Sequence, residues 1–182
     1  MSKFAFYGIV RSISIHTVGS KSFFADSKWR DTYQFLPRIV QENWLADSID
    51  LSKQCVLENN KIFEDSSMKN VGLFNEHDVK IIAGTDTPIG FLTPGYSLHK
   101  ELELQVEAGL TPLQALRSAT ITPAKFFNLD NKIGTIDPGK YADLVILNSN
   151  PLEKIKNTQD IHIVISKGKI QQKLGNLYYH FN

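Results

Sequence analysis

The sequence is poor in cysteine and has no long apolar segment. Cys55 is the only cysteine among 182 residues, so the chain cannot form an internal disulfide and has no cysteine cluster for structural zinc. No apolar run approaches the roughly 20 residues that a helix needs to cross a membrane. Residues 1–8 lack the apolar core and small-residue cleavage site of a signal peptide. We therefore expect a cytoplasmic protein by default, although any longer parent protein could still be exported.

The sequence also lacks an excess of either charge. Lysine and arginine together number 20, aspartate and glutamate number 19, and the formal net charge is +1. Proteins that bind nucleic acid or an anionic membrane surface through electrostatics usually carry a clear basic excess. We therefore expect neither nucleic acid nor a membrane as a partner.

The most informative segment of the sequence is residues 79–88. A short, β-branched apolar run ends in Gly84, Thr85 and Asp86, which is typical of a buried parallel strand. Ligands and catalytic groups gather at the carboxyl ends of such strands, so Asp86 is a candidate site residue. Asp86 could instead cap a turn, since aspartate often does so. A phosphoryl-accepting role is disfavoured, because the expected second acid two positions later is Pro88.

The segments before this strand predict a second strand and a long helical connection. Residues 9–16 alternate between apolar and polar side chains, as a strand with two unlike faces does. Residues 21–50 favour a mostly helical insertion that is broken near Pro37, and residues 51–76 favour a further helix. A strand, a crossover helix and the strand at 79–83 would form two neighbouring parallel strands.

A helix is predicted after the strand. Leu98, Leu102 and Val106 recur at helical spacing, and Gly109 is placed to end the helix as a carboxyl-terminal cap. We expect this apolar stripe to pack in the core.

Two further helix starts follow. Thr111 is followed by Pro112 at the first helical position and by Gln114 at the third, which is the composition of a capping box. Thr122-Pro123 repeats the pattern for a short helix through Phe127. Both starts predict short helices joined by tight turns.

The pattern changes near residue 129. Residues 137–140 favour a turn, and residues 142–147 favour a strand. Residues 161–165 alternate with isoleucine at every second position, and Lys167-Gly168 would turn the chain back on itself. We therefore predict two domains, residues 1–129 and residues 130–182.

Four sequence blocks carry a family resemblance: G-T-D at 84–86, A-G-L-T-P at 108–112, A-T-x-x-P-A at 119–124 and G-T-I-x-P-G-K-x-A-D-L-V at 134–145. In this order they resemble the carboxyl-terminal part of the amidohydrolase superfamily. The resemblance is greatest to the branch of imidazolonepropionase-like and dipeptidase-like metal-dependent hydrolases, and it covers about residues 71–170. It implies an α/β fold, in which the carboxyl-terminal portion of a TIM-type (β/α)₈ barrel precedes strands of a small β-sandwich.

The resemblance also implies a chemistry. In this family an aspartate after the eighth barrel strand binds a divalent metal, here expected to be zinc, and takes a proton from the attacking water. Asp86 matches that aspartate, which would make it both metal ligand and general base. The substrate would be a small amide or a dipeptide that loses a C–N bond. Thr87, Tyr96 and His99 lie where the family forms its substrate pocket, and His16 would line the barrel mouth if residues 9–16 are the seventh strand. His99 could instead be an ordinary half-exposed helical histidine, and His16 a surface histidine.

The sequence departs from the family in its other metal ligands. The five histidines include no His-x-His pair, and a catalytic zinc usually needs three protein ligands. A complete (β/α)₈ barrel also needs about 250 residues. We therefore expect a carboxyl-terminal fragment that is inactive alone and holds no metal by itself, so that enzymatic activity of this chain is left open.

Because the other metal ligands of the family are missing, a second hypothesis is also open. The chain could be a non-catalytic module that folds on a partner, either the missing amino-terminal half of the barrel or a second copy in a homo-oligomer. An incomplete barrel would expose strand edges and apolar helix faces, which promote association.

Overall fold

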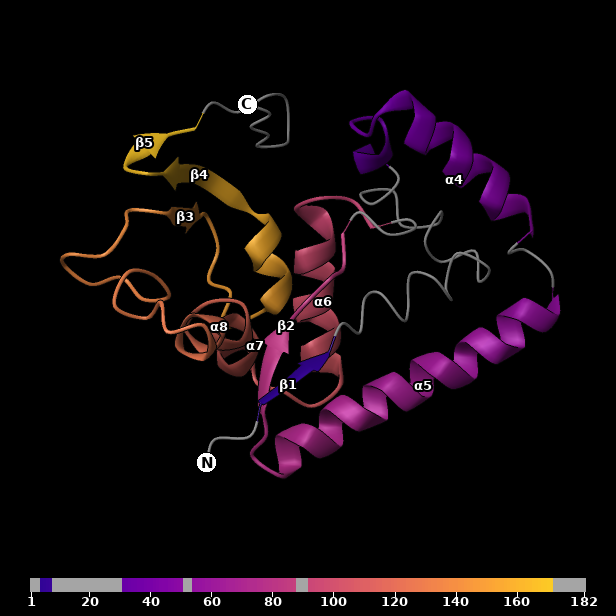
Figure 1. Cartoon of the computed structure of the whole chain (residues 1–182), viewed down its shortest axis with the longest axis horizontal. Helices are drawn as coiled ribbons and strands as arrows, with labels where there is room; N and C mark the ends of the chain where they lie inside the picture. Colours follow the sequence, from indigo (N-terminus) through magenta and orange to yellow (C-terminus); the bar gives the residue numbers. More distant parts are fainter. Residues whose placement is uncertain (1–3, 8–30, 51–53, 88–91, 172–182) are drawn as a thin grey trace.

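The computed structural model describes residues 4–7, 31–50, 54–87 and 92–171 (Figure 1). The predicted strand at 9–16, with His16, lies outside these described residues. Within them no helix is long and apolar enough to cross a lipid bilayer.

Two parallel strands lie next to each other near the middle of the molecule. β1 (Phe4–Tyr7) pairs with β2 (Lys80–Ala83), with Ala5 opposite Ile81. Ile81 and Ile82 point to opposite faces and are only 6% and 3% exposed, so β2 is covered on both sides, as parallel strands usually are. The predicted strand is confirmed, whereas its partner at residues 4–7 was not anticipated.

Helices connect the two strands. α4 (Arg38–Asp50) begins directly after Pro37, so the predicted break there is confirmed. α5 (Gln54–Glu76) returns the chain toward β2 and crosses α6 closely at Gly72, where an added Cβ would lie 2.9 Å from the Ala108 carbonyl oxygen. In Figure 1, α5 extends away from the strand pair as the longest element. The two parallel strands and the helices between them have the predicted order, although the first strand lies at residues 4–7 and not at 9–16.

Three helices follow β2, and the predicted caps define the first two. α6 (Tyr96–Glu107) ends in a Schellman motif, in which the Leu110 N–H donates to the Gln105 carbonyl and Gly109 adopts a φ of 108°. α7 (Pro112–Ser118) begins with a complete capping box between Thr111 and Gln114. Both predictions are confirmed.

The third helix begins earlier than predicted. α8 (Ile121–Phe126) has Thr120, not Thr122, at its N-cap, and the Thr120 hydroxyl donates to the Leu116 carbonyl instead of capping the helix. Because α8 follows α7 closely, the Thr120 hydroxyl bonds to a carbonyl of α7 and does not cap α8.

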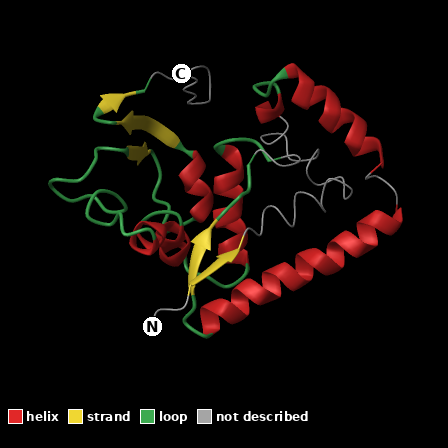
Figure 2. Ribbon diagram, viewed as in Figure 1, coloured by secondary structure: helices red, strands yellow, loops and turns green. Residues whose placement is uncertain are grey.

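A small antiparallel sheet follows a long loop (Figure 2, green). Its strand order is β3 (Leu144–Leu147), β4 (Ile161–Ser166) and β5 (Lys169–Ile170), and the short 3-10 helix η1 (Ile155–Gln159) precedes β4. Lys167 and Gly168 both have positive φ, as a two-residue hairpin turn requires. The hairpin prediction is confirmed, and a full β-sandwich stays a prediction.

Two clusters of buried side chains form the core. The larger cluster packs β2, α5 and α6 together and consists of Trp44, Val71, Ile81, Leu92, Tyr96, Leu104 and Leu110. The smaller cluster, Leu102, Ala115 and Ile155, packs η1 against α6 and α7. It contains residues from both sides of position 129.

The predicted stripe on α6 is wrong at one position. Leu98 is 40% exposed, whereas Leu102 is buried and Val106 packs at the edge of the smaller cluster. Polar side chains occupy much of the buried surface of this helix instead, including Glu101, Glu103 and Gln105. Neighbouring elements therefore cover α6 on more than one side.

Candidate functional site

Asp86 lies just beyond the carboxyl end of β2. The strand ends at Ala83, and Gly84 and Thr85 carry the chain to an exposed Asp86. The backbone of Asp86 has a φ of 54°, in the left-handed region that aspartate tolerates better than most residues. Strained conformations of this kind often mark functional sites.

Local hydrogen bonds fix the loop around Asp86. The hydroxyl oxygens of Thr85 and Thr87 lie 2.8 Å apart, and the Thr87 N–H donates weakly to the Thr85 hydroxyl over 3.4 Å. Thr87 is half-buried beside this bond. The two threonines therefore bracket Asp86 and hold the loop at the strand end.

Tyr96 lies at the start of α6 and is only 9% exposed. It belongs to the larger core cluster, where Leu92 and Leu104 are also buried. The preceding Gly95 has a φ of 81°, which lets the chain enter the helix sharply. The structure thus places Tyr96 in the core, and its contact with substrate stays a prediction.

His99 lies one turn further along α6 and is half-buried. Its Nδ1 atom is buried and has no hydrogen-bond partner within the part of the chain that the structure describes. Burial lowers the pKa of His99 below its ordinary value, and the negative charge of Glu103 partly opposes this shift. His99 therefore has one buried ring nitrogen without a partner among the described residues.

Two further aspartates have partners outside the Asp86 loop. Asp143 accepts a hydrogen bond from the Lys167 N–H over 2.6 Å, and Asp137 forms an ion pair with Lys140 over 3.3 Å. Asp143 lies directly before β3, and Asp137 begins the segment 137–140. His77 and His162 are exposed.

The described residues do not form a complete metal centre. Across residues 4–7, 31–50, 54–87 and 92–171, no group of three or more His, Cys, Asp or Glu side chains could hold a metal ion. Since catalytic zinc usually has three protein ligands, these residues alone do not fit the metal that the sequence predicts. Asp86 and His99 are therefore single candidate groups.

Glu103 is a buried acid that was not predicted from the sequence. The carboxylate of Glu103 has only 2% side-chain exposure and contacts both α6 and η1. The alternation Glu101-Leu102-Glu103-Leu104 could have indicated it, because it places acids on more than one side of a helix that the core surrounds.

Comparisons with known proteins identify the family. A sequence profile described as the amidohydrolase family matches residues 21–171. An adenine deaminase of Ruegeria sp. (strain TM1040) is 29% identical over 97 residues, which make up 53% of this chain and 15% of the deaminase. An adenine deaminase of Staphylothermus marinus is 30% identical over 107 residues, which make up 59% of this chain and 17% of the deaminase. This chain therefore spans less than a fifth of the length of these relatives.

Solved structures agree with the sequence match. A Xaa-Pro dipeptidase with methionine bound in its active site has a TM-score of 0.59 and 27% identity, covering 79% of this chain and 33% of the dipeptidase. A prolidase complexed with N-methylphosphonate-L-proline has a TM-score of 0.61 over 94% of this chain and 35% of the prolidase, and at 20% identity it shows the fold alone. The family profile spans most of the sequence, and this chain belongs to the amidohydrolase family.

Proposed function

We propose that this chain provides the strand-end aspartate of a metal-dependent hydrolase that cleaves C–N bonds in small amides or dipeptides. The position of Asp86 is the observation that carries the proposal. Asp86 is exposed, follows a buried parallel strand and has a left-handed backbone. Members of the amidohydrolase family generally use a divalent metal, and a carboxylate at this position is suited to bind one and to accept a proton.

The names of the relatives support the bond class. An adenine deaminase and a Xaa-Pro dipeptidase both break a C–N bond by hydrolysis. We propose that His99 contacts the substrate through its buried Nδ1 atom, with Thr87 and Tyr96 contributing to the same pocket. Zinc is the proposed metal, with its remaining ligands outside the described residues.

A second candidate function is a non-catalytic module that acts only with a partner. It is favoured by the lack of a three-ligand metal group among the described residues. The partner would be an amino-terminal barrel half or a second copy of the chain, and the chain alone would then be inactive and free of metal.

Metal content per chain distinguishes the two functions. The chain would be purified with zinc supplied and desalted, and its metal would be measured by elemental mass spectrometry. The test variant is Asp86→Asn, and the matched control is Asp78→Asn. Both aspartates are exposed and have a φ of 54°, but Asp78 precedes β2 and Asp86 follows it. Asparagine also tolerates this backbone conformation.

We expect almost no bound zinc in any of the three proteins alone. When an amino-terminal half of the barrel is added, we expect zinc in the wild type and in Asp78→Asn, but not in Asp86→Asn. Retention of zinc by Asp86→Asn would overturn the role of Asp86 as a ligand. Wild-type protein that holds no metal even with that half present would overturn the proposed metal centre and support the non-catalytic module.

A further inference from the structure

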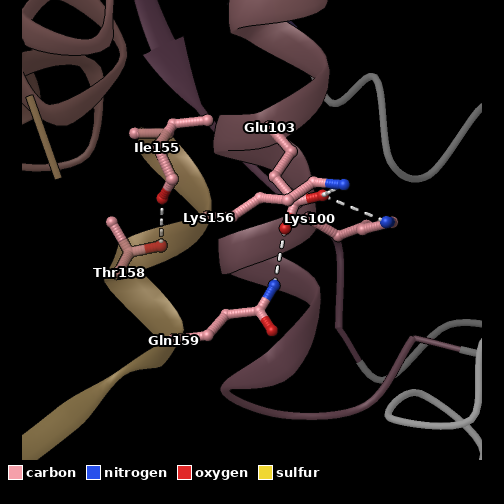
Figure 3. Close-up of polar contacts among 6 residues, drawn as sticks. All are labelled: Lys100, Glu103, Ile155, Lys156, Thr158 and Gln159. Carbon is pink, nitrogen blue, oxygen red and sulfur yellow. Dashed lines mark hydrogen bonds and ion pairs between the residues drawn. The ribbon is translucent and has the colours of Figure 1, made fainter. Parts of the chain in front are cut away.

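Side chains from two elements, α6 and η1, hold the buried carboxylate of Glu103. Its Oε2 atom lies 3.1 Å from Nζ of Lys100 on the same helix and 3.8 Å from Nζ of Lys156 on η1. Its Oε1 atom accepts a hydrogen bond from Nε2 of Gln159, also on η1, over 2.5 Å. Figure 3 shows these three side chains converging on the carboxylate from α6 and η1. Both carboxylate oxygens therefore have partners.

Apolar packing supports this polar contact. Ile155 begins η1, is 7% exposed and packs with Leu102 and Ala115. The Thr158 hydroxyl donates to the Ile155 carbonyl over 2.9 Å within η1 (Figure 3). Leu102 and Glu103 are adjacent in α6, so η1 contacts an apolar side chain and a charged one next to each other. The position of η1 on α6 is thus fixed in two ways.

His99 precedes Glu103 by four residues on the same helix. Side chains four residues apart lie one above the other on a helix surface, and the charge of Glu103 acts on the imidazole. The carboxylate is 2% exposed, so water screens its charge only weakly. The negative charge of Glu103 therefore acts on the imidazole of His99 from one helical turn away.

Other charged groups lie on α6 and on the elements packed against it. Glu101 on α6 is buried and accepts a hydrogen bond from Nε2 of Gln105. Lys100 on α6 and Lys156 on η1 are the cations bound to Glu103. Besides η1, the elements that contact α6 most extensively are α7, α5 and β2. Their charged side chains with described burial are all exposed: Asp65, Lys69, Glu76, Lys80 and Arg117.

We infer that Glu103 is a positioning residue for His99, and that η1 holds Glu103 in place. Contacts made by residues 155–159 therefore set the electrostatic surroundings of a side chain in the candidate site. The consequence for substrate binding rests on the proposed function of His99, whereas the link between η1 and His99 does not.

The test is the titration of His99 in the full chain, followed by NMR of its imidazole signals. The spectrum of His99→Gln assigns the resonance. Glu103→Gln removes the negative charge and should lower the pKa of His99 further. Lys156→Gln removes a positive charge and should raise it. Lys154→Gln is the matched control, because Lys154 is an exposed lysine just before η1 that forms no ion pair with Glu103.

Opposite shifts in Glu103→Gln and Lys156→Gln, with none in Lys154→Gln, would support the inference. A folded Glu103→Gln protein with an unchanged His99 titration would overturn it, since Glu103 would then only stabilise the fold. If Glu103→Gln does not fold, Lys156→Gln decides, because its side chain is 56% exposed and its loss should be tolerated. The absence of a shift in that variant would equally overturn the inference. Metal binding does not enter this measurement, so its outcome is independent of the Asp86 test.

Discussion

Truncation of Ile155 should destabilise the chain by separating η1 from α6. Ile155 is 7% exposed and packs with Leu102 and Ala115. Ile155→Ala deletes three carbon groups, which at about 0.8 kcal/mol each is a loss of about 2.4 kcal/mol in transfer free energy. A residual cavity adds to this, and buried Ile→Ala changes cost about 2–5 kcal/mol in total. We expect a value near the middle of that range, because the cluster is small and can partly close.

The assay is urea unfolding of the full chain, with the free energy of unfolding extrapolated to water. Leu152→Ala is the control, since Leu152 lies in the same segment but is 52% exposed, and its truncation should cost less than about 0.5 kcal/mol. Equal and small effects of the two variants would refute the packing of η1 on α6. A large effect of Ile155→Ala alone would confirm that the Ile155 side chain packs with residues on the other side of position 129.

Two further predictions concern the α7 cap and His99. Thr111→Ala removes the side chain that accepts the Gln114 N–H over 3.3 Å, and should lower the free energy of unfolding by about 1 kcal/mol. Thr120→Ala, which removes a hydroxyl that does not cap α8, should cost less in the same urea assay, and a reversed order would contradict the capping role. Because burial lowers the pKa of His99, the folded chain binds fewer protons there than the unfolded chain. Stability should therefore be highest above the ordinary histidine pKa and fall as the pH drops toward the lowered value, and His99→Gln should remove that part of the slope.

Local features of the fold were predictable from the sequence. The capping box at Thr111 and Gln114 and the hairpin turn at Lys167-Gly168 depend on residues that are close in sequence, and both are present. The strand before Asp86 was predictable for the same reason, since β-branched residues and a terminal glycine define it. Short-range chemistry is sufficient for such elements.

Long-range features were not predictable. The pairing of β1 with β2 joins residues far apart in the chain, and the alternation at residues 9–16 gave a more obvious strand than residues 4–7. Leu98 is exposed although it fits the apolar stripe, because neighbouring elements select which sides of α6 are buried. The left-handed backbone of Asp86 also has no local sequence marker, since aspartate occurs in many conformations.

The buried acids of α6 show how such polar residues are tolerated. Glu101 accepts a hydrogen bond from Nε2 of Gln105 over 3.0 Å, and the Gln105 oxygen accepts one from the Ser118 hydroxyl over 2.6 Å. Burying an unpaired charge costs several kcal/mol. That cost is comparable with the whole free energy of unfolding of a domain. These bonds run from α6 to α7, whereas those of Glu103 run from α6 to η1.

The change in sequence pattern near residue 129 and the packing of the chain therefore depend on different factors. The pattern shows where helices give way to antiparallel strands, which depends on local composition. The packing shows that η1 contributes Ile155, Lys156 and Gln159 to the surroundings of α6. Since α6 also carries His99, a substitution in the segment after residue 129 can act on the candidate site without lying near Asp86. Such an effect should follow the charge on Glu103 rather than distance along the chain.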